Sequence, residues 1–139
     1  IVGVKEATGD LKQVSDVVEF SRKGFSVLSG DDFTTLPLLS VGGSGVISVT
    51  SNIVPRAVAD MVDAFLSGDI DKAKRLHYRI EPLNRAMFLE TNPVPVKTAL
   101  AMMGMIKEEF RLPLVKISDE NRARLRDALK NYGMPLKRR

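Results

Sequence analysis

Cysteine and tryptophan are absent from the 139 residues of this chain, and His77 is its single histidine. Without cysteine, a disulfide framework, a thiolate nucleophile and a cysteine-ligated zinc site are excluded. With one histidine, we expect neither a histidine-based metal site nor a Ser-His-Asp triad. The lack of cysteine also agrees with a reducing compartment, and we therefore expect a cytoplasmic protein.

Long apolar runs are missing as well: the longest is far too short to span a membrane, and no signal peptide is visible. The formal net charge is +4, and much of that excess comes from the tail, Lys137, Arg138 and Arg139. Elsewhere basic and acidic residues alternate, and the aromatic residues, 6% of the chain, mostly stand singly. Nucleic-acid surfaces combine a basic stripe with aromatic side chains, so we expect binding neither to nucleic acid nor to membranes.

The composition that is present suits a folded protein, because 44% of the residues are hydrophobic and 27% are charged. A chain of this length is one ordinary domain or part of a larger one. Its first residue, Ile1, already lies inside an apolar run. We therefore expect the chain to begin within a longer structure.

The first half of the chain alternates strand-like and helix-like segments. Apolar stretches rich in β-branched residues predict strands at residues 1–5, 25–30 and 46–49. Such strands, joined by helices, predict a parallel sheet covered by helices, either an open doubly wound sheet or a (β/α)8 barrel. A helix is expected after each strand. The first has its cap at Asp10 and its stop at Gly24, and the second has its cap at Asp31 or Asp32 and its end near Val41. The third has its cap at Asn52 and its stop at Gly68.

From residue 69 onward the pattern is helical throughout. Pro82 interrupts an apolar stripe and predicts a kink or a break. The change of character near Gly68 predicts an α/β part at residues 1–68 and an all-helical domain at residues 69–139. Further signals are a helix start at Asn92 and Pro93, a connector at residues 111–113, and a last helix capped by Ser118 and stopped by Gly133.

Lys5 is the first residue with a candidate chemical role, because it stands at the carboxyl end of the first predicted strand. Active sites of parallel α/β folds gather at that end. A lysine held among apolar side chains resists protonation, and its neutral amine can form a Schiff base with a carbonyl substrate. The alternative is a solvated lysine just past a strand, since most lysines are exposed.

Other polar motifs have structural explanations beside functional ones. Asp31 and Asp32 serve either acid–base chemistry or helix capping, and we favour capping. The GGSG segment at residues 42–45 is similar to a phosphate loop, but it precedes a strand instead of following one, so we predict a turn. Gly30 ends a strand at the active edge, where glycine lets the backbone approach a ligand. We expect His77 on a helix surface, and we expect Met102, Met103 and Met105 to fill the core.

Four segments resemble the dihydrodipicolinate synthase family, also called 4-hydroxy-tetrahydrodipicolinate synthases. IVGVKEATGD at residues 1–10 is similar to the segment with that family's Schiff-base lysine, and SGDD at residues 29–32 to its next strand end. GGSGVISV at residues 42–49 resembles the strand after it, and NPVPVK at residues 92–97, with the RLP connector, resembles its helical domain. The resemblance covers essentially the whole chain. N-acetylneuraminate lyases and related 2-keto-acid aldolases share the lysine and the fold but are less similar in sequence.

This resemblance implies a fold, a reaction and three site residues. The fold is the C-terminal part of a (β/α)8 barrel, strands six to eight, followed by an all-helical domain. The family's lysine condenses with pyruvate, and the enamine adds to L-aspartate semialdehyde on the path to diaminopimelate and lysine. Carried over, Lys5 is the Schiff-base nucleophile, Ile47 offers its backbone carbonyl beside pyruvate, and Gly30 lines the same pocket. No organic cofactor or metal is implied, because the lysine iminium is itself the electron sink.

A complete barrel of this kind needs roughly 250 residues, so the resemblance implies that the remaining N-terminal half lies elsewhere. We expect the chain to be inactive alone, either as part of a longer enzyme or as a piece that completes a barrel with another chain. Family resemblance also implies a homotetramer or homodimer. The alternatives are a sister lyase with another aldehyde, such as an N-acetylneuraminate or sugar-acid lyase, and a non-catalytic assembly remnant.

Overall fold

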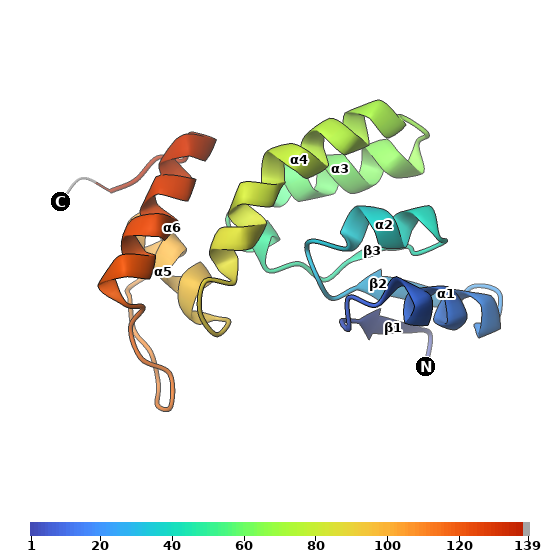
Figure 1. The fold of residues 1–139 in the computed structure, drawn as a ribbon, viewed down its shortest axis with the longest axis horizontal. Coiled ribbons are helices and arrows are strands. Elements are labelled where there is room, and N and C mark those ends of the chain that lie inside the picture. The colour runs from blue at the N-terminus through green and yellow to red at the C-terminus, as the bar shows by residue number, and fades with distance from the viewer. Residues whose placement is uncertain (138–139) are drawn as a thin grey trace.

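The computed structural model describes residues 1–137, and Arg138 and Arg139 lie outside the described residues. Figure 1 shows the strands and α1 at the N-terminal end of the long axis, and α5 and α6 at the opposite end. In chain order the elements are β1 (Gly3–Glu6), α1 (Leu11–Phe20), β2 (Ser26–Ser29), α2 (Thr35–Ser40), β3 (Gly45–Val46), the 3-10 helix η1 (Thr50–Asn52), α3 (Pro55–Leu66), α4 (Ile70–Met87), α5 (Val94–Met102) and α6 (Asp119–Tyr132).

The three strands form one parallel sheet in the order β1-β2-β3, as the alternating pattern predicts. Lys5 pairs with Leu28 in the register of β1 and β2, and Leu28 pairs with Gly45 of β3. Within the described residues β2 is therefore the central strand, and β1 and β3 are the edges. Because all three strands run in the same direction, their carboxyl ends meet at one edge of the sheet.

The two faces of the sheet differ in what covers them. Val27 of β2 is buried in a small apolar cluster with Val14 of α1 and Leu38 of α2. Side chains alternate across a strand, so Leu28 and its register neighbour Lys5 lie on the opposite face. There Leu28 is half-buried and Lys5 is exposed. The sheet thus has one face packed on helices and a second face that bears Lys5.

Helix α1 begins where the sequence predicts, because the Asp10 carboxylate accepts hydrogen bonds from the backbone N–H groups of Lys12 and Gln13. Its end is earlier than predicted. The helix stops at Phe20 and Ser21 takes an extended conformation, while Gly24, with φ of 81°, lies in the following turn. Glycine is needed there for the left-handed turn into β2 and not for the helix end.

The predicted capping of α2 by Asp31 or Asp32 is wrong. Helix α2 begins at Thr35, with Thr34 at the N-cap position. Asp31 Oδ1 instead accepts a hydrogen bond from Phe33 N at 3.1 Å. Asp32 points away from α2 and bonds residues 48–50. These partners explain the short third strand: residues 48–50 bond Asp32, so β3 ends at Val46 and does not extend over residues 46–49.

The predicted cap of α3 is also wrong. Asn52 lies in η1, and its side-chain Nδ2 donates to Val49 O at 2.9 Å. Helix α3 begins later, at Pro55, after Val54. Proline at the first helical position needs no intrahelical partner for its nitrogen, which makes Pro55 the local start signal. Gly68 follows the end of α3 with φ of 86°, as expected for a helix stop.

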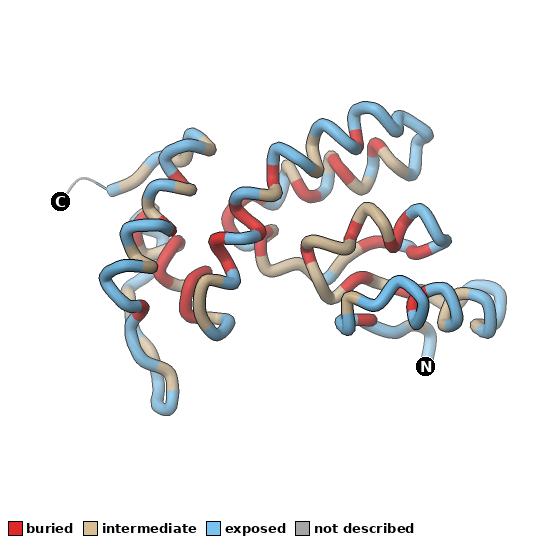
Figure 2. Tube along the Cα trace, viewed as in Figure 1, coloured by how far each residue is buried: buried red, intermediate tan, exposed pale blue. Residues whose placement is uncertain are grey.

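The larger apolar core joins η1, α3, α4, α5 and α6, and includes Met61, Leu83, Met87, Leu125 and Leu129. Figure 2 shows buried segments along α3, α4 and α5, whereas most of α1 is exposed. Of the predicted kink or break at Pro82, the break is wrong, because α4 continues from Ile70 to Met87 with Pro82 inside it. A proline in a helix interior costs about 3 kcal/mol. Burial of the apolar side chains on either side of it, Ile80 and Leu83, offsets that cost.

The last two helices follow their sequence signals closely. Helix α5 begins at Val94, with Pro93 one position before the helix. The Ser118 hydroxyl accepts a hydrogen bond from Asn121 N at the start of α6, and Gly133 ends it with φ of 93°, both as predicted. Of the methionines, Met102 is buried and Met103 packs against the core, but Met105 is 63% exposed, contrary to prediction. In the described part of the chain, no helix combines the length and apolar character needed to cross a membrane.

Candidate functional site

Lys5 lies near the carboxyl end of β1, one residue before that strand ends at Glu6. It belongs to an edge strand and pairs in register with Leu28 of the central strand. Its side chain is on the face opposite the helix-covered cluster, where it is exposed. A cavity of about 440 Å³ is present in the molecule, but Ala101, Met102 and Arg122 are among the residues that line it, far along the chain in α5 and α6.

Gly30 lies directly against Lys5. A Cβ atom added to Gly30 would stand 2.7 Å from Lys5 Cε, closer than a Cβ atom is found to another atom, and 3.0 Å from Lys5 Cγ, which is a tight contact. The same atom would stand 2.5 Å from the Cβ of Ala7. Gly30 N donates a hydrogen bond to Glu6 O, which keeps the end of β2 beside the end of β1. The absence of a side chain at residue 30 is therefore what lets the Lys5 side chain cross the end of β2.

Ile47 follows β3 at the same edge of the sheet. Its N–H donates to Ser29 O at 2.7 Å, and this hydrogen bond continues the pairing of β2 with β3 by one residue. The Ile47 side chain is 47% exposed. The three predicted site residues thus stand at the carboxyl ends of three adjacent parallel strands, and the structure places the first two in direct proximity.

Glu6 is a buried residue that the sequence reasoning did not single out. It is 6% exposed, and its Oε1 accepts hydrogen bonds from Thr8 N at 2.9 Å and from the Thr8 hydroxyl. Gln13 Nε2 of α1 donates to the same oxygen at 3.5 Å. Glu6 therefore shapes the loop that follows Lys5. The signal available in the sequence is a glutamate directly after an apolar strand, with a threonine two residues later.

Asp32 is the second buried carboxylate at this edge, with 5% exposure. Its Oδ2 accepts from Val49 N at 2.9 Å and from Thr50 N at 3.2 Å. Its Oδ1 accepts a short hydrogen bond from the Ser48 hydroxyl. Asp32 thereby joins the loop after β2 to the loop after β3. Nothing within a few residues of Asp32 signals these partners.

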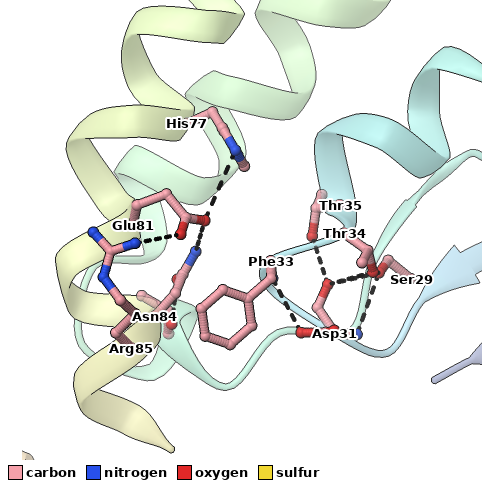
Figure 3. Close-up of polar contacts among 10 residues, drawn as sticks. Ser29, Asp31, Phe33, Thr34, Thr35, His77, Glu81, Asn84 and Arg85 are labelled. Atoms are coloured by element: carbon pink, nitrogen blue, oxygen red, sulfur yellow. Dashed lines mark hydrogen bonds and ion pairs between the residues drawn. The ribbon is translucent and has the colours of Figure 1, made fainter. Parts of the chain in front are cut away.

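Asp31 forms hydrogen bonds with residues close to it in the chain and does not join its loop to the loop after β3 as Asp32 does. Figure 3 shows its carboxylate beside Phe33 and its backbone oxygen beside the hydroxyl groups of Ser29 and Thr35. The Ser29 hydroxyl donates to Asp31 O at 2.7 Å, and the Thr35 hydroxyl donates to the same oxygen at 3.1 Å. Asp31 is therefore a loop-shaping residue and does not cap α2, which is the role that we favoured over acid–base chemistry.

Figure 3 also shows a polar cluster centred on Glu81 of α4, on the other side of Phe33 from Asp31. The Glu81 carboxylate accepts from Asn84 Nδ2 at 3.1 Å and from Arg85 at 3.2 Å, and His77 Nε2 lies 3.8 Å away. Asn84 Oδ1 in turn accepts from the Thr50 hydroxyl at 2.7 Å, which ties η1 to α4. The predicted surface position of His77 is wrong, because its side chain is only 13% exposed.

The glycine-rich segment at residues 42–45 is a turn from α2 into β3, as predicted. A Cβ atom added to Gly43 would stand 1.8 Å from Leu38 Cδ2, so glycine is required there by packing against α2. Among residues 1–137, no group of three or more histidine, aspartate and glutamate side chains is arranged to hold a metal ion.

Comparison with known proteins identifies relatives along almost the whole chain. The family described as "Dihydrodipicolinate synthetase family" matches residues 1–132. A 4-hydroxy-tetrahydrodipicolinate synthase of Nitratidesulfovibrio vulgaris is 62% identical over 134 residues, which are 96% of this chain and 46% of the relative. The chain thus spans about half the length of the curated relatives that it matches.

Comparison with solved structures finds proteins of the same name. The crystal structure of dihydrodipicolinate synthase from Aquifex aeolicus superposes with a TM-score of 0.97 at 48% identity, covering 99% of this chain and 47% of that one. A chloride-inhibited dihydrodipicolinate synthase from Acinetobacter baumannii, complexed with pyruvate, superposes with a TM-score of 0.92 at 40% identity, covering 96% of this chain and 46% of that one. The three parallel strands and their helices are therefore a part of that fold.

Proposed function

The chain belongs to the dihydrodipicolinate synthetase family, and we propose that it forms the Schiff-base half of an aldolase-type lyase that condenses pyruvate with L-aspartate semialdehyde. In this proposal the Lys5 amine attacks the ketone carbon of pyruvate, water leaves, and an iminium forms. Loss of a proton from the pyruvate methyl group yields an enamine, which adds to the aldehyde. The cyclised product feeds diaminopimelate and lysine synthesis.

The contact between Lys5 and Gly30 is the observation that carries this proposal. An imine-forming amine must reach a bound keto acid at the edge where the parallel strands end. The Lys5 side chain lies against the one residue of the next strand end that has no side chain. The missing side chain at residue 30 leaves the space over the end of β2 to the Lys5 side chain, which brings its amine to the edge where the strands end. A solved relative complexed with pyruvate supports this choice of keto acid.

We assign the other two site residues by position. Gly30 lines the pyruvate pocket, and the backbone carbonyl of Ile47 lies beside the bound keto acid. Gly30 stands at the strand end next to Lys5 and Ile47 at the end of the strand after that, and their backbones are fixed by hydrogen bonds to the neighbouring strands. No organic cofactor enters this mechanism, because the iminium on Lys5 accepts the electron pair left when the methyl proton is lost, and the resulting enamine supplies that pair to the new carbon–carbon bond.

We propose further that the strands are the sixth to eighth of a (β/α)8 barrel, with residues 1–68 in the barrel and residues 69–139 in a helical domain. A barrel interior is filled by side chains from all of its strands. The exposed face with Lys5 is then an interior face, and the remaining N-terminal half supplies the opposite wall. Without that half the chain is inactive in this proposal. The complete enzyme is a cytoplasmic homotetramer or homodimer.

Borohydride trapping tests the proposal directly. In the full-length enzyme that carries these residues, pyruvate and borohydride should yield a stable adduct that peptide mapping places on Lys5. The variant Lys5→Arg should give no adduct, whereas Lys12→Arg, on the exposed surface of α1, should trap as the unsubstituted enzyme does. An adduct on any other lysine, or none at all, would contradict the assignment.

The identity of the aldehyde needs a separate measurement. We expect turnover of pyruvate with L-aspartate semialdehyde and none with N-acetylmannosamine, because the relative named above is a 4-hydroxy-tetrahydrodipicolinate synthase at 62% identity. The reverse preference would indicate a sister lyase. Retention of fold and assembly with no trapping at all would indicate a non-catalytic remnant.

A further inference from the structure

Two loops at the candidate site are joined by a single buried side chain. Asp32 comes from the loop after β2, two residues beyond Gly30, and accepts three hydrogen bonds from residues 48–50 after β3. Two of the three donors are backbone N–H groups, those of Val49 and Thr50. Thr50 is fully buried, so in the absence of this carboxylate its N–H would have no water to replace the lost acceptor.

Ile47 lies directly before this anchored segment, and its backbone is held from both sides. On one side its N–H donates to Ser29 O at 2.7 Å. On the other side, the next residues are held by Asp32. The Ser48 hydroxyl adds a local tie, because it also accepts from Ser51 N at 2.7 Å. Strand pairing therefore holds Ile47 on its amino side, and Asp32 holds the residues on its carbonyl side.

From this geometry we propose that Asp32 is a positioning residue for the keto acid, which aims the Ile47 carbonyl at the substrate beside Lys5. This inference rests on the proposed function. In this proposal the Asp32 carboxylate does not contact the substrate. It fixes the distance between the loop of Gly30 and the loop of Ile47. Without Asp32, the segment after β3 is free to turn its carbonyl away, and the keto acid is held less tightly before the imine forms.

The chain offers variants that separate positioning from charge. Asp32→Ala removes all three acceptor contacts. Asp32→Asn retains an oxygen for Val49 N and Thr50 N, and its amide N–H can donate to the Ser48 hydroxyl oxygen. Asp31→Ala is the matched control, because the Asp31 carboxylate accepts from Phe33 N within its own loop. The full-length enzyme is used throughout, and correct folding is checked by the thermal midpoint.

The measurement is borohydride trapping on Lys5 as a function of pyruvate concentration. For Asp32→Ala we expect the half-saturating pyruvate concentration to rise about tenfold or more, since the buried Thr50 N–H and the partly buried Val49 N–H lose their acceptor. The adduct yield at saturation should match the unsubstituted enzyme, because the Lys5 amine is intact. For Asp32→Asn and Asp31→Ala we expect values within about threefold of the unsubstituted enzyme.

Each outcome decides the proposal. An unchanged half-saturation in Asp32→Ala, with normal adduct, would overturn the role of Asp32 and leave the role of Lys5 standing. Equal loss in Asp32→Asn and Asp32→Ala would overturn it as well, by assigning the effect to charge. If Asp32→Ala does not fold, Ser48→Ala takes its place, and an unchanged half-saturation there would overturn the proposal. Absence of any adduct in the unsubstituted enzyme would instead remove the proposed function itself.

Discussion

At residue 30 the molecule has no room for a side chain. A Cβ atom there would stand within 3.0 Å of two carbon atoms of Lys5 and of the Cβ of Ala7. The Lys5 side chain can move, but the Cβ of Ala7 is fixed to the backbone of a loop that the Glu6 carboxylate holds by hydrogen bonds. Even the smallest side chain at residue 30 therefore displaces the amine from the place where the structure puts it.

We predict that Gly30→Ala slows imine formation on Lys5 by about a hundredfold, because a misplacement of about 1 Å costs that much in a positioned reaction. Single-turnover trapping with pyruvate in the full-length enzyme measures it. Gly24→Ala is the control: its added Cβ meets nothing within 4 Å, although its φ of 81° strains any side chain. It should lower stability by about 1 kcal/mol without changing the trapping rate. Equal trapping rates in Gly30→Ala and the unsubstituted enzyme would contradict the contact.

At the scale of elements, α6 is capped partly from another segment. Glu90, between α4 and α5, accepts hydrogen bonds from Asn121 Nδ2 at 2.9 Å and from Ser118 N at 3.0 Å. The Ser118 hydroxyl donates to the same oxygen at 2.7 Å. The hydrogen bond from the Asn121 side chain, followed by those from Ser118, lowers the pKa of Glu90 below its ordinary value. The ionised carboxylate therefore favours the folded state.

This pKa shift predicts a pH-dependent contribution to stability. Because the pKa of Glu90 is lower in the folded state, its contribution is present above the ordinary glutamate pKa of 4.5 and is lost as pH falls through the folded value. Glu90→Gln should lower the thermal midpoint at neutral pH by a few degrees and have less effect in acid below that pKa. Scanning calorimetry over this range measures the difference.

The control for this experiment is Glu109→Gln, which replaces an exposed glutamate in the connector between α5 and α6. It should leave the pH dependence of the midpoint unchanged. A constant difference between Glu90→Gln and the unsubstituted protein at all pH values would show that the charge of Glu90 does not stabilise the start of α6.

At the scale of the whole molecule, the larger core decides stability. Leu125 and Leu129 of α6 are fully buried in the cluster that joins α3 to α6. Leu125→Ala should lower the free energy of unfolding by about 2–5 kcal/mol, from lost burial and the cavity left behind. Leu112→Ala, at a position that is 86% exposed, should change it by about 0.5 kcal/mol or less. Urea unfolding of both variants measures this, and similar values would contradict the packing of α6.

The open face and edges of the sheet predict how the 139-residue polypeptide behaves when prepared by itself. Ile1 and Val2 are largely exposed next to edge strand β1, and Val4 is 38% exposed within it. Unpaired strand edges with apolar residues promote pairing between molecules. We expect association that grows with protein concentration in sedimentation velocity, and weaker association in Val4→Lys, which places a charge on β1. A monomer at all concentrations that melts cooperatively would contradict this expectation.

Local signals in the sequence were sufficient at the start of α1 and at both ends of α6. Asp10, Ser118 and Gly133 start or stop their helices as predicted, because each acts on backbone groups a few residues away. The parallel sheet with covering helices was also predictable from the spacing of apolar strands. The family motifs predicted site roles for Lys5, Gly30 and Ile47, and the placement of these residues at one edge follows from the parallel direction of the strands.

The length of β3, the continuity of α4 and the task of the Asp32 carboxylate were decided by tertiary structure alone. Asp32 bonds residues 16 to 18 positions away, and the Thr50 hydroxyl bonds Asn84 at a separation of 34 residues. Such partners carry no local pattern, because the chain brings them together only after the sheet and helices have packed. For the same reason the sequence marked Asp32 as a helix cap, and only the folded chain turned it toward the loop of Ile47.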